Sequence, residues 1–156
     1  MEKQVLLKVR GLKKYFLVRG FRRAGMLKAV DGVDFDVLAG ETLGVVGESG
    51  CGKTTLARTV IRLYRPTAGE IVYRGRDISR VPEPELRWMR KEVQMIFQDP
   101  FASLNPRMTV NDIISEPLVL SGYGRERCKQ RVQELLEMVG LNPEHVNRYP
   151  HEFSGG

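Results

Sequence analysis

The sequence predicts an α/β fold organised around a phosphate-binding loop, because three neighbouring segments fit that arrangement. Residues 47–55 (GESGCGKTT) match the pattern G-x-x-x-x-G-K-[ST]. The apolar run 41–46 (ETLGVV) before them is typical of a buried parallel strand. Apolar residues at helical spacing follow in residues 54–64, so we expect a helix that begins at the loop and points the positive end of its dipole at an anion.

The residue types inside this loop suit the chemistry of phosphate binding. Glycines let the backbone wrap tightly, so that successive N–H groups point inward at an anion. Lys53 is expected to reach the β- and γ-phosphates, in binding and in catalysis, and the Thr54 hydroxyl is expected to ligate Mg²⁺. A glycine-rich turn that fits by chance is the alternative, which the flanking strand and helix disfavour. The residues expected to contact the nucleotide are Gly47, Glu48, Ser49, Gly50, Cys51, Gly52, Lys53, Thr54 and Thr55.

The other predicted elements follow from local patterns. Apolar and alternating runs predict strands over residues 5–10, 32–37, 70–73 and 93–97. Helical spacing and N-terminal signals predict helices over residues 82–90, from Thr109 onward, and over 125–139. Strands dominate before Gln98 and helices after it. The sequence therefore predicts a nucleotide-binding core over residues 1–97 and a helical subdomain over residues 98–156.

Composition narrows the class of protein. The chain has 156 residues, 28% of them charged, and a net charge of +6, as in a soluble globular protein. It has no apolar run of about 18 residues that would span a membrane, and its start lacks the apolar core of a secretory signal. Basic residues gather in residues 1–30, notably Arg19, Arg22 and Arg23. A solvated loop between strands is favoured there over a nucleic-acid or anionic-lipid contact, because no aromatic platform accompanies the arginines.

Three further stretches resemble motifs of the ABC-type ATPases. Residues 93–106 (VQMIFQDPFASLNP) look like the Q-loop, and residues 149–156 (YPHEFSGG) look like the start of the signature motif. Residues 12–16 (LKKYF) resemble the segment that supplies an adenine-stacking aromatic ring. The amino-acid sequences of the first two stretches are similar to those of the oligopeptide/dipeptide importer branch. The resemblance covers the whole chain and implies a P-loop NTPase fold: an N-terminal β subdomain, a RecA-like core and a helical subdomain, incomplete at the C-terminus.

This resemblance implies roles for individual residues and two cofactors, ATP and Mg²⁺. Phe16 is expected to stack on adenine, with Tyr15 as the second choice; half-buried packing beside a strand is the competing interpretation of both. Gln98 is expected to be catalytic, with an amide that contacts Mg²⁺ and the attacking water. The start of the signature motif should open a helix whose N–H groups face the γ-phosphate of ATP held by a partner subunit. Its residues are Ser154, Gly155 and Gly156.

The implied function is that of an importer motor that energises uptake of peptides or similar small solutes by binding and hydrolysing ATP. Its partners would be a second ATP-binding subunit, arranged head to tail, and permease subunits that contact residues 98–106; no nucleic acid is expected. The protein would be cytoplasmic, peripheral on the inner face of the cell membrane. Two alternatives stay open: a non-hydrolysing nucleotide-binding remnant or N-terminal fragment of a longer ATPase, and a soluble ABC ATPase acting on nucleic acid or the ribosome.

The family's remaining motifs do not occur in this sequence. The Walker B aspartate, the catalytic glutamate and the switch histidine normally follow the signature motif. The resemblance therefore implies that this chain binds ATP with Mg²⁺ but hydrolyses it poorly by itself. In this fold class the strands beside the phosphate-loop strand also come later in the sequence, so residues 42–46 are expected to have unpaired edges.

Overall fold

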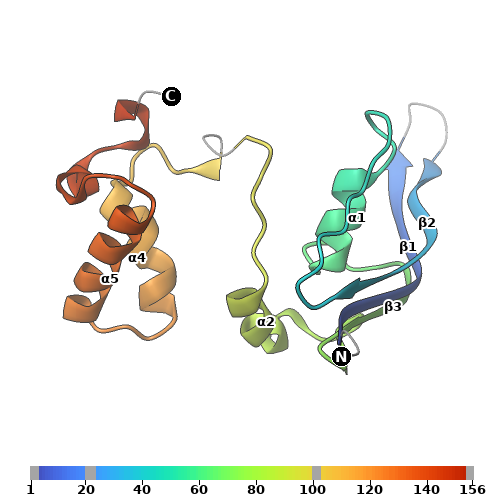
Figure 1. The fold of residues 1–156 in the computed structure, drawn as a ribbon. Coiled ribbons are helices and arrows are strands. Elements are labelled where there is room, and N and C mark those ends of the chain that lie inside the picture. The colour runs from blue at the N-terminus through green and yellow to red at the C-terminus, as the bar shows by residue number, and fades with distance from the viewer. Residues whose placement is uncertain (1–3, 20–23, 100–102, 154–156) are drawn as a thin grey trace. The chain divides into compact units, whose positions relative to one another are not determined.

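The computed structural model describes residues 4–19, 24–99 and 103–153. The chain forms two compact units, residues 1–94 and residues 95–156. The first unit combines an antiparallel sheet with short helices, and the second is helical (Figure 1). Each unit has side chains buried among its own elements.

The first unit is built on a sheet of four antiparallel strands in the order β2-β1-β3-β4. Strands β1 (Val5–Arg19) and β2 (Ala24–Leu38) form a long ribbon, well beyond the short strands expected at 5–10 and 32–37. Strands β3 (Ala68–Tyr73) and β4 (Arg76–Asp77) follow. The loop expected at the basic cluster falls largely on residues 20–23, which lie outside the described residues.

Helix α1 (Lys53–Val60) and the pair formed by η1 (Glu83–Leu86) and α2 (Arg87–Glu92) complete this unit. Apolar side chains from the helices and from the sheet form one core, and each contributes about 1.5–3 kcal/mol by its burial. The buried members of this core are Val9, Leu12, Val30, Ile71, Tyr73, Ile78, Leu86 and Met89. Leu56 and Val60 of α1 pack against it, so the core holds the helix that follows the phosphate loop.

Two expected strands are not formed in this structure. Residues 41–48 and 93–97 are not strands, and Val46 and Ile96 are 93% and 92% exposed. The prediction of a buried strand before the phosphate loop is therefore wrong for this chain. A strand needs a neighbour that accepts and donates its backbone hydrogen bonds, and the strands among the described residues pair only with one another. The expectation of unpaired edges at 42–46 agrees with this arrangement.

The second unit consists of helices α4 (Val110–Leu120) and α5 (Arg125–Met138) and the short turns η2 (Pro143–Asn147) and η3 (Pro150–Glu152). The helices expected from Thr109 and over 125–139 are confirmed. Three side chains of α5 that follow the helical spacing are buried, at Cys128, Val132 and Leu136. Among the described residues, no helix has the length and apolar character needed to cross a membrane.

Helix α4 begins with a reciprocal cap. The Thr109 hydroxyl accepts a hydrogen bond from the Asp112 N–H at 3.2 Å, and the Asp112 carboxylate accepts one from the Thr109 N–H at 3.1 Å. Thr109→Ala is therefore expected to lower the free energy of unfolding by about 1 kcal/mol, measured by urea unfolding followed by circular dichroism. Ser115→Ala is the control, because that hydroxyl donates to backbone carbonyls one turn earlier on the same helix. Equal losses in the two variants would contradict the capping role.

Candidate functional site

The phosphate-binding pattern forms the turn that leads into α1. Gly52 is the N-cap of the helix and has the left-handed φ of 100°. A Cβ atom at this position would lie 2.2 Å from the carbonyl oxygen of Ala29 in β2, so only glycine fits. The loop therefore lies between the sheet and α1, and at Gly52 its backbone packs directly against the backbone of β2.

Lys53 reaches back into the loop that precedes it. Its Nζ donates to the carbonyl oxygens of Gly47 and Glu48, both at 2.6 Å, and lies 3.6 Å from the Cys51 Sγ. The ammonium group thus sits within the curve of residues 47–53. Phosphate oxygens are stronger acceptors for a charged amine than neutral carbonyls, so they can take the place of these two acceptors.

The start of α1 has the electrostatic character of an anion site. No side chain caps the helix, and its first turn contains no acidic residue. The first N–H groups of the helix are therefore available to a ligand, and the helix dipole adds partial positive charge there. Thr54 is exposed beside them. Among the described residues, no group of three or more His, Cys, Asp or Glu could hold a metal ion.

Tyr15 and Phe16, the two candidates for adenine stacking, are both half-buried in β1. The Phe16 ring packs edge-on against Tyr64 at 5.5 Å between centroids, with the Lys14 Nζ 4.8 Å from its centre. The Tyr15 hydroxyl donates to Asp31, which lowers the pKa of that carboxyl and raises the pKa of the phenol. The two rings thus have separate sets of partners, and their role toward adenine stays a prediction.

The remaining predicted site residues lie in the second unit. Gln98 is exposed at a bend, whereas the phosphate loop belongs to the first unit. Its contact with Mg²⁺ and water therefore stays a prediction. Ser154, Gly155 and Gly156 lie outside the described residues.

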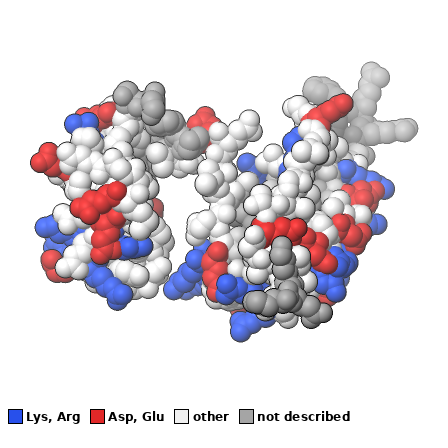
Figure 2. Space-filling model, in the orientation of Figure 1, with Lys and Arg blue, Asp and Glu red and all other residues white. Residues whose placement is uncertain are grey.

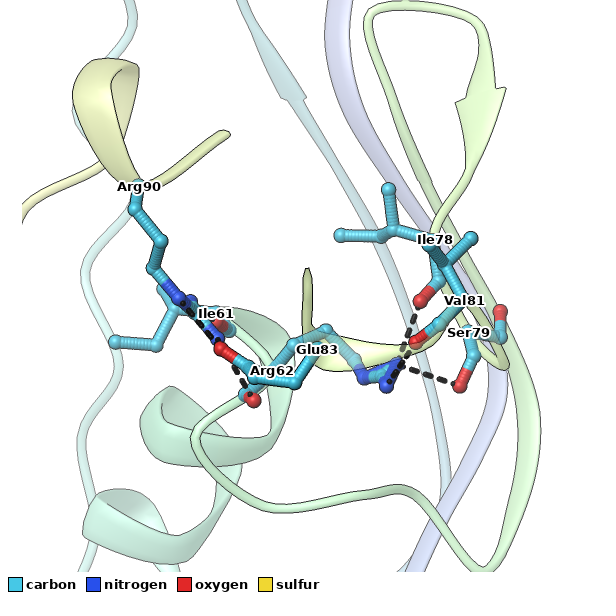
Figure 3. A network of polar contacts seen from close by, with 7 residues as sticks. All are labelled: Ile61, Arg62, Ile78, Ser79, Val81, Glu83 and Arg90. Atoms are coloured by element: carbon cyan, nitrogen blue, oxygen red, sulfur yellow. Dashed lines mark hydrogen bonds and ion pairs between the residues drawn. The ribbon is translucent and has the colours of Figure 1, made fainter. Parts of the chain in front are cut away.

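A buried polar cluster at the other end of α1 was missed by the sequence analysis (Figure 3). Arg62 is 3% exposed, and its guanidinium donates to the carbonyl oxygens of Ile78 and Ser79 at 2.6 and 2.8 Å and of Val81 at 2.9 Å. Burial lowers the pKa of this guanidinium. The acceptors are backbone atoms, and no pattern of side chains in the sequence marks them.

The basic residues of the N-terminal region are balanced by acids in the folded sheet. Asp31 lies within ion-pair distance of Lys13 and Lys28, at 3.7 and 3.4 Å, and Arg10 pairs with Asp36 at 2.6 Å. On the face shown in Figure 2, charges of both signs are interspersed, with no single basic stripe. The preference for a solvated loop at the arginine cluster stays a prediction, because residues 20–23 lie outside the described residues.

Comparison with known proteins gives consistent matches. The chain is 54% identical over 158 residues to the oligopeptide transport ATP-binding protein AppF of Bacillus subtilis (strain 168), covering 98% of this chain and 48% of that protein. It is 53% identical over 154 residues to OppF, an oligopeptide transport ATP-binding protein of the same organism, covering 97% and 49%. The chain thus spans about half the length of the curated relatives it matches.

The fold is similar to solved ATP-binding cassettes. The dimeric MJ0796 in a post-hydrolysis state bound to ADP and Pi matches with a TM-score of 0.80 and 25% identity, covering 95% of this chain and 63% of that chain. The expected ABC ATPase nucleotide-binding domain is thereby confirmed as the fold class. A family model described as ABC transporter also matches residues 30–156, a range that includes the phosphate loop and α1. The chain therefore belongs to the ABC transporter family.

Proposed function

We propose that this chain supplies the ATP-binding site of a transporter that energises the uptake of peptides or similar small solutes. The observation that carries the proposal is the position of the Lys53 amine, held by the Gly47 and Glu48 carbonyls at the start of α1. The named function of AppF and OppF, oligopeptide transport, supports the choice of solute class.

In this proposal the loop binds the nucleotide through charge and backbone geometry. Lys53 exchanges its two carbonyl acceptors for β- and γ-phosphate oxygens, and the first N–H groups of α1 donate to the same oxygens. Thr54 and Gln98 are the residues that would hold Mg²⁺, together with phosphate oxygens and water. The bound Mg²⁺ would neutralise charge on the phosphates.

Hydrolysis by this chain alone is expected to be slow. Phosphoryl transfer depends mainly on positioning and on electrostatic stabilisation, which Lys53 and Gln98 supply in part. We assign no carboxylate of this chain as the base that orients water. Binding of ATP is therefore the activity to test first.

We further propose that the site is completed by partners. A second ATP-binding subunit would pack head to tail, so that the N–H groups of residues 154–156 face its nucleotide. Permease subunits would contact residues 98–106 on the inner face of the membrane. The dimeric state of MJ0796 supports the first of these, and the transport function named for the relatives supports the second.

ATP-dependent thermal stabilisation tests the binding proposal. MgATP at about 100 times its dissociation constant should stabilise the chain by about 2.7 kcal/mol, seen as a rise in the melting temperature. Lys53→Ala should remove this rise, because the amine that meets the phosphates is gone. Lys129→Ala, an exposed lysine of α5, is the matched control and should respond like the wild type. No rise in the wild type, or equal rises in wild type and Lys53→Ala, would refute the proposal.

A further inference from the structure

We propose that Arg90 is a positioning residue for the nucleotide site: it fixes the carboxyl end of α1, whose amino end forms the phosphate site, and ties it to the helix that leads toward Gln98. This inference rests on the proposed nucleotide-binding function. Arg90 lies outside the phosphate-binding pattern, and it acts through the position of a helix.

The carboxyl end of α1 closes in an unusual way. The Leu63 N–H bonds to the Arg58 carbonyl at 2.8 Å and the Arg62 N–H to the Thr59 carbonyl at 3.0 Å, which together form a Schellman motif. The residue in the left-handed conformation at such a helix end is usually glycine, but here it is Arg62, with φ of 61°. The surrounding contacts must therefore hold this backbone in place.

Arg90 supplies a large part of those contacts. One guanidinium nitrogen, Nη1, donates to the Ile61 carbonyl, and Nη2 donates to the Arg62 carbonyl at 3.0 Å (Figure 3). Nε and Nη2 also donate to the Glu83 carboxylate, at 3.1 and 2.8 Å, which fixes the plane of the guanidinium. The cation thus lies at the negative end of the α1 dipole and satisfies carbonyls that the helix leaves free. Lysine could not reproduce this planar fork.

The backbone of Arg90 belongs to α2, which is itself tied to the sheet and to the next segment. Met89, one residue earlier, is 1% exposed in the core. The Arg90 carbonyl accepts a hydrogen bond from the Gln94 side chain at 2.8 Å, and the Val93 N–H bonds to the Met89 carbonyl at 2.8 Å. Residues 93–98 then continue to Gln98. One side chain therefore connects the end of the phosphate-loop helix to the start of the segment that carries the predicted catalytic amide.

The rigidity of α1 links the contacts at its carboxyl end to ligand binding at its amino end. Helix α1 has eight residues, so motion at its carboxyl end is transmitted to Lys53 only about 12 Å away. A loop that must be ordered when the ligand binds loses affinity. Without Arg90, we expect α1 to be less firmly held and the phosphate site to be less preorganised.

The test compares Arg90→Met, Arg90→Lys and Glu83→Gln in the full chain, at a temperature at which circular dichroism shows each variant folded. Dissociation constants for a fluorescent ATP analogue with Mg²⁺ are measured, together with amide hydrogen exchange along α1, β1 and β3. Arg90→Met should weaken binding about five- to tenfold, with Arg90→Lys in between and Glu83→Gln close to wild type. Exchange should accelerate in α1 more than in β1 and β3. Arg131→Met is the matched control, since Arg131 also pairs with a carboxylate, that of Glu134 at 2.7 Å.

The outcomes separate this proposal from its alternatives. If Arg90 only stabilises the fold, the dissociation constant stays unchanged in the folded variants and exchange accelerates evenly, which overturns the proposal. If the wild type does not bind nucleotide, the proposed function fails. Amide hydrogen exchange then tests the role of Arg90. Unchanged protection of α1 in the variants overturns the positioning role, and a loss of protection confined to α1 supports it. If Arg90→Met does not fold, Arg90→Lys is compared with Glu83→Gln by the same two measurements.

Discussion

Arg62→Met is expected to lower the free energy of unfolding by about 3 kcal/mol. The substitution keeps most of the apolar stem but leaves three backbone carbonyls, those of Ile78, Ser79 and Val81, without their donor. Each unsatisfied buried acceptor costs about 1–3 kcal/mol, and relief of the buried charge offsets part of the sum. Urea unfolding followed by the emission of Trp88 measures this, because the chain's one tryptophan lies in α2 of the same unit.

Replacing Arg62 by glycine and by alanine separates the effect of the backbone conformation from the effect of losing the side chain. Arg62→Gly and Arg62→Ala both lose the guanidinium, but Arg62 has φ of 61°, where glycine is comfortable and alanine is strained by about 1–2 kcal/mol. We therefore expect Arg62→Gly to be the more stable of the two by about 1 kcal/mol. Arg131→Met, which removes an exposed ion pair, should change the free energy of unfolding by less than about 0.5 kcal/mol. A loss at Arg62→Met as small as this control would contradict the structural role of the buried guanidinium.

Gly52→Ala should abolish the stabilisation of the chain by MgATP and also destabilise the unliganded fold by about 1–3 kcal/mol. The added methyl group would lie 2.2 Å from the Ala29 carbonyl oxygen, at a φ of 100° that alanine resists. The loop can relieve this contact only by moving away from β2, and that movement displaces Lys53 and the first turn of α1. Thermal unfolding with and without MgATP measures both effects.

Two other glycines make this experiment specific. Gly50 has a left-handed φ of 81° but no atom within 4 Å of the position of a Cβ, so Gly50→Ala should show the backbone strain alone. Gly44 lies before the loop with open space around it and should tolerate alanine without loss of the nucleotide effect. If Gly52→Ala retains the full response to MgATP, the close approach of loop and strand is not needed for binding.

Elements whose pattern is local were predictable from the sequence, and elements that depend on partners were not. The helices from Thr109 and over residues 125–139 were recognised because the residues that predict them are close neighbours along the chain. The full length of β1 was not, since Arg10, Lys13 and Lys14 interrupt its apolar pattern. These charges are tolerated in the sheet because each has a polar partner. Arg10 pairs with Asp36, Lys13 lies near Asp31, and the Lys14 Nζ donates to the Arg65 carbonyl oxygen. Residues 41–46 show the opposite error, because a strand was predicted there and none is formed. Their composition suits a strand, but a strand also needs a neighbouring strand to pair with.

The residues of the candidate site also fall into those that the sequence predicts and those that it does not. Residues 47–55 were found because the chemistry of phosphate binding imposes a fixed spacing on the chain. The clamp by Arg90 on the carbonyls of Ile61 and Arg62 could not be found, because an arginine that binds backbone atoms far along the chain leaves no pairing of residue types. Helix α1 ends at Val60, earlier than the predicted end near Tyr64, because the chain takes the left-handed conformation at Arg62.

The extent of the first core bears on how the protein folds during synthesis. All eight buried core side chains of the first unit lie between Val9 and Met89 in the sequence. A nascent chain folds from its N-terminal end while translation proceeds at about 5–20 residues per second. Once residue 94 has left the ribosome, every side chain of that core is available, so the first unit, including the loop between β2 and α1, can fold before the second unit is complete. The proposed phosphate site could then form, and bind nucleotide, before the helices of the second unit are made.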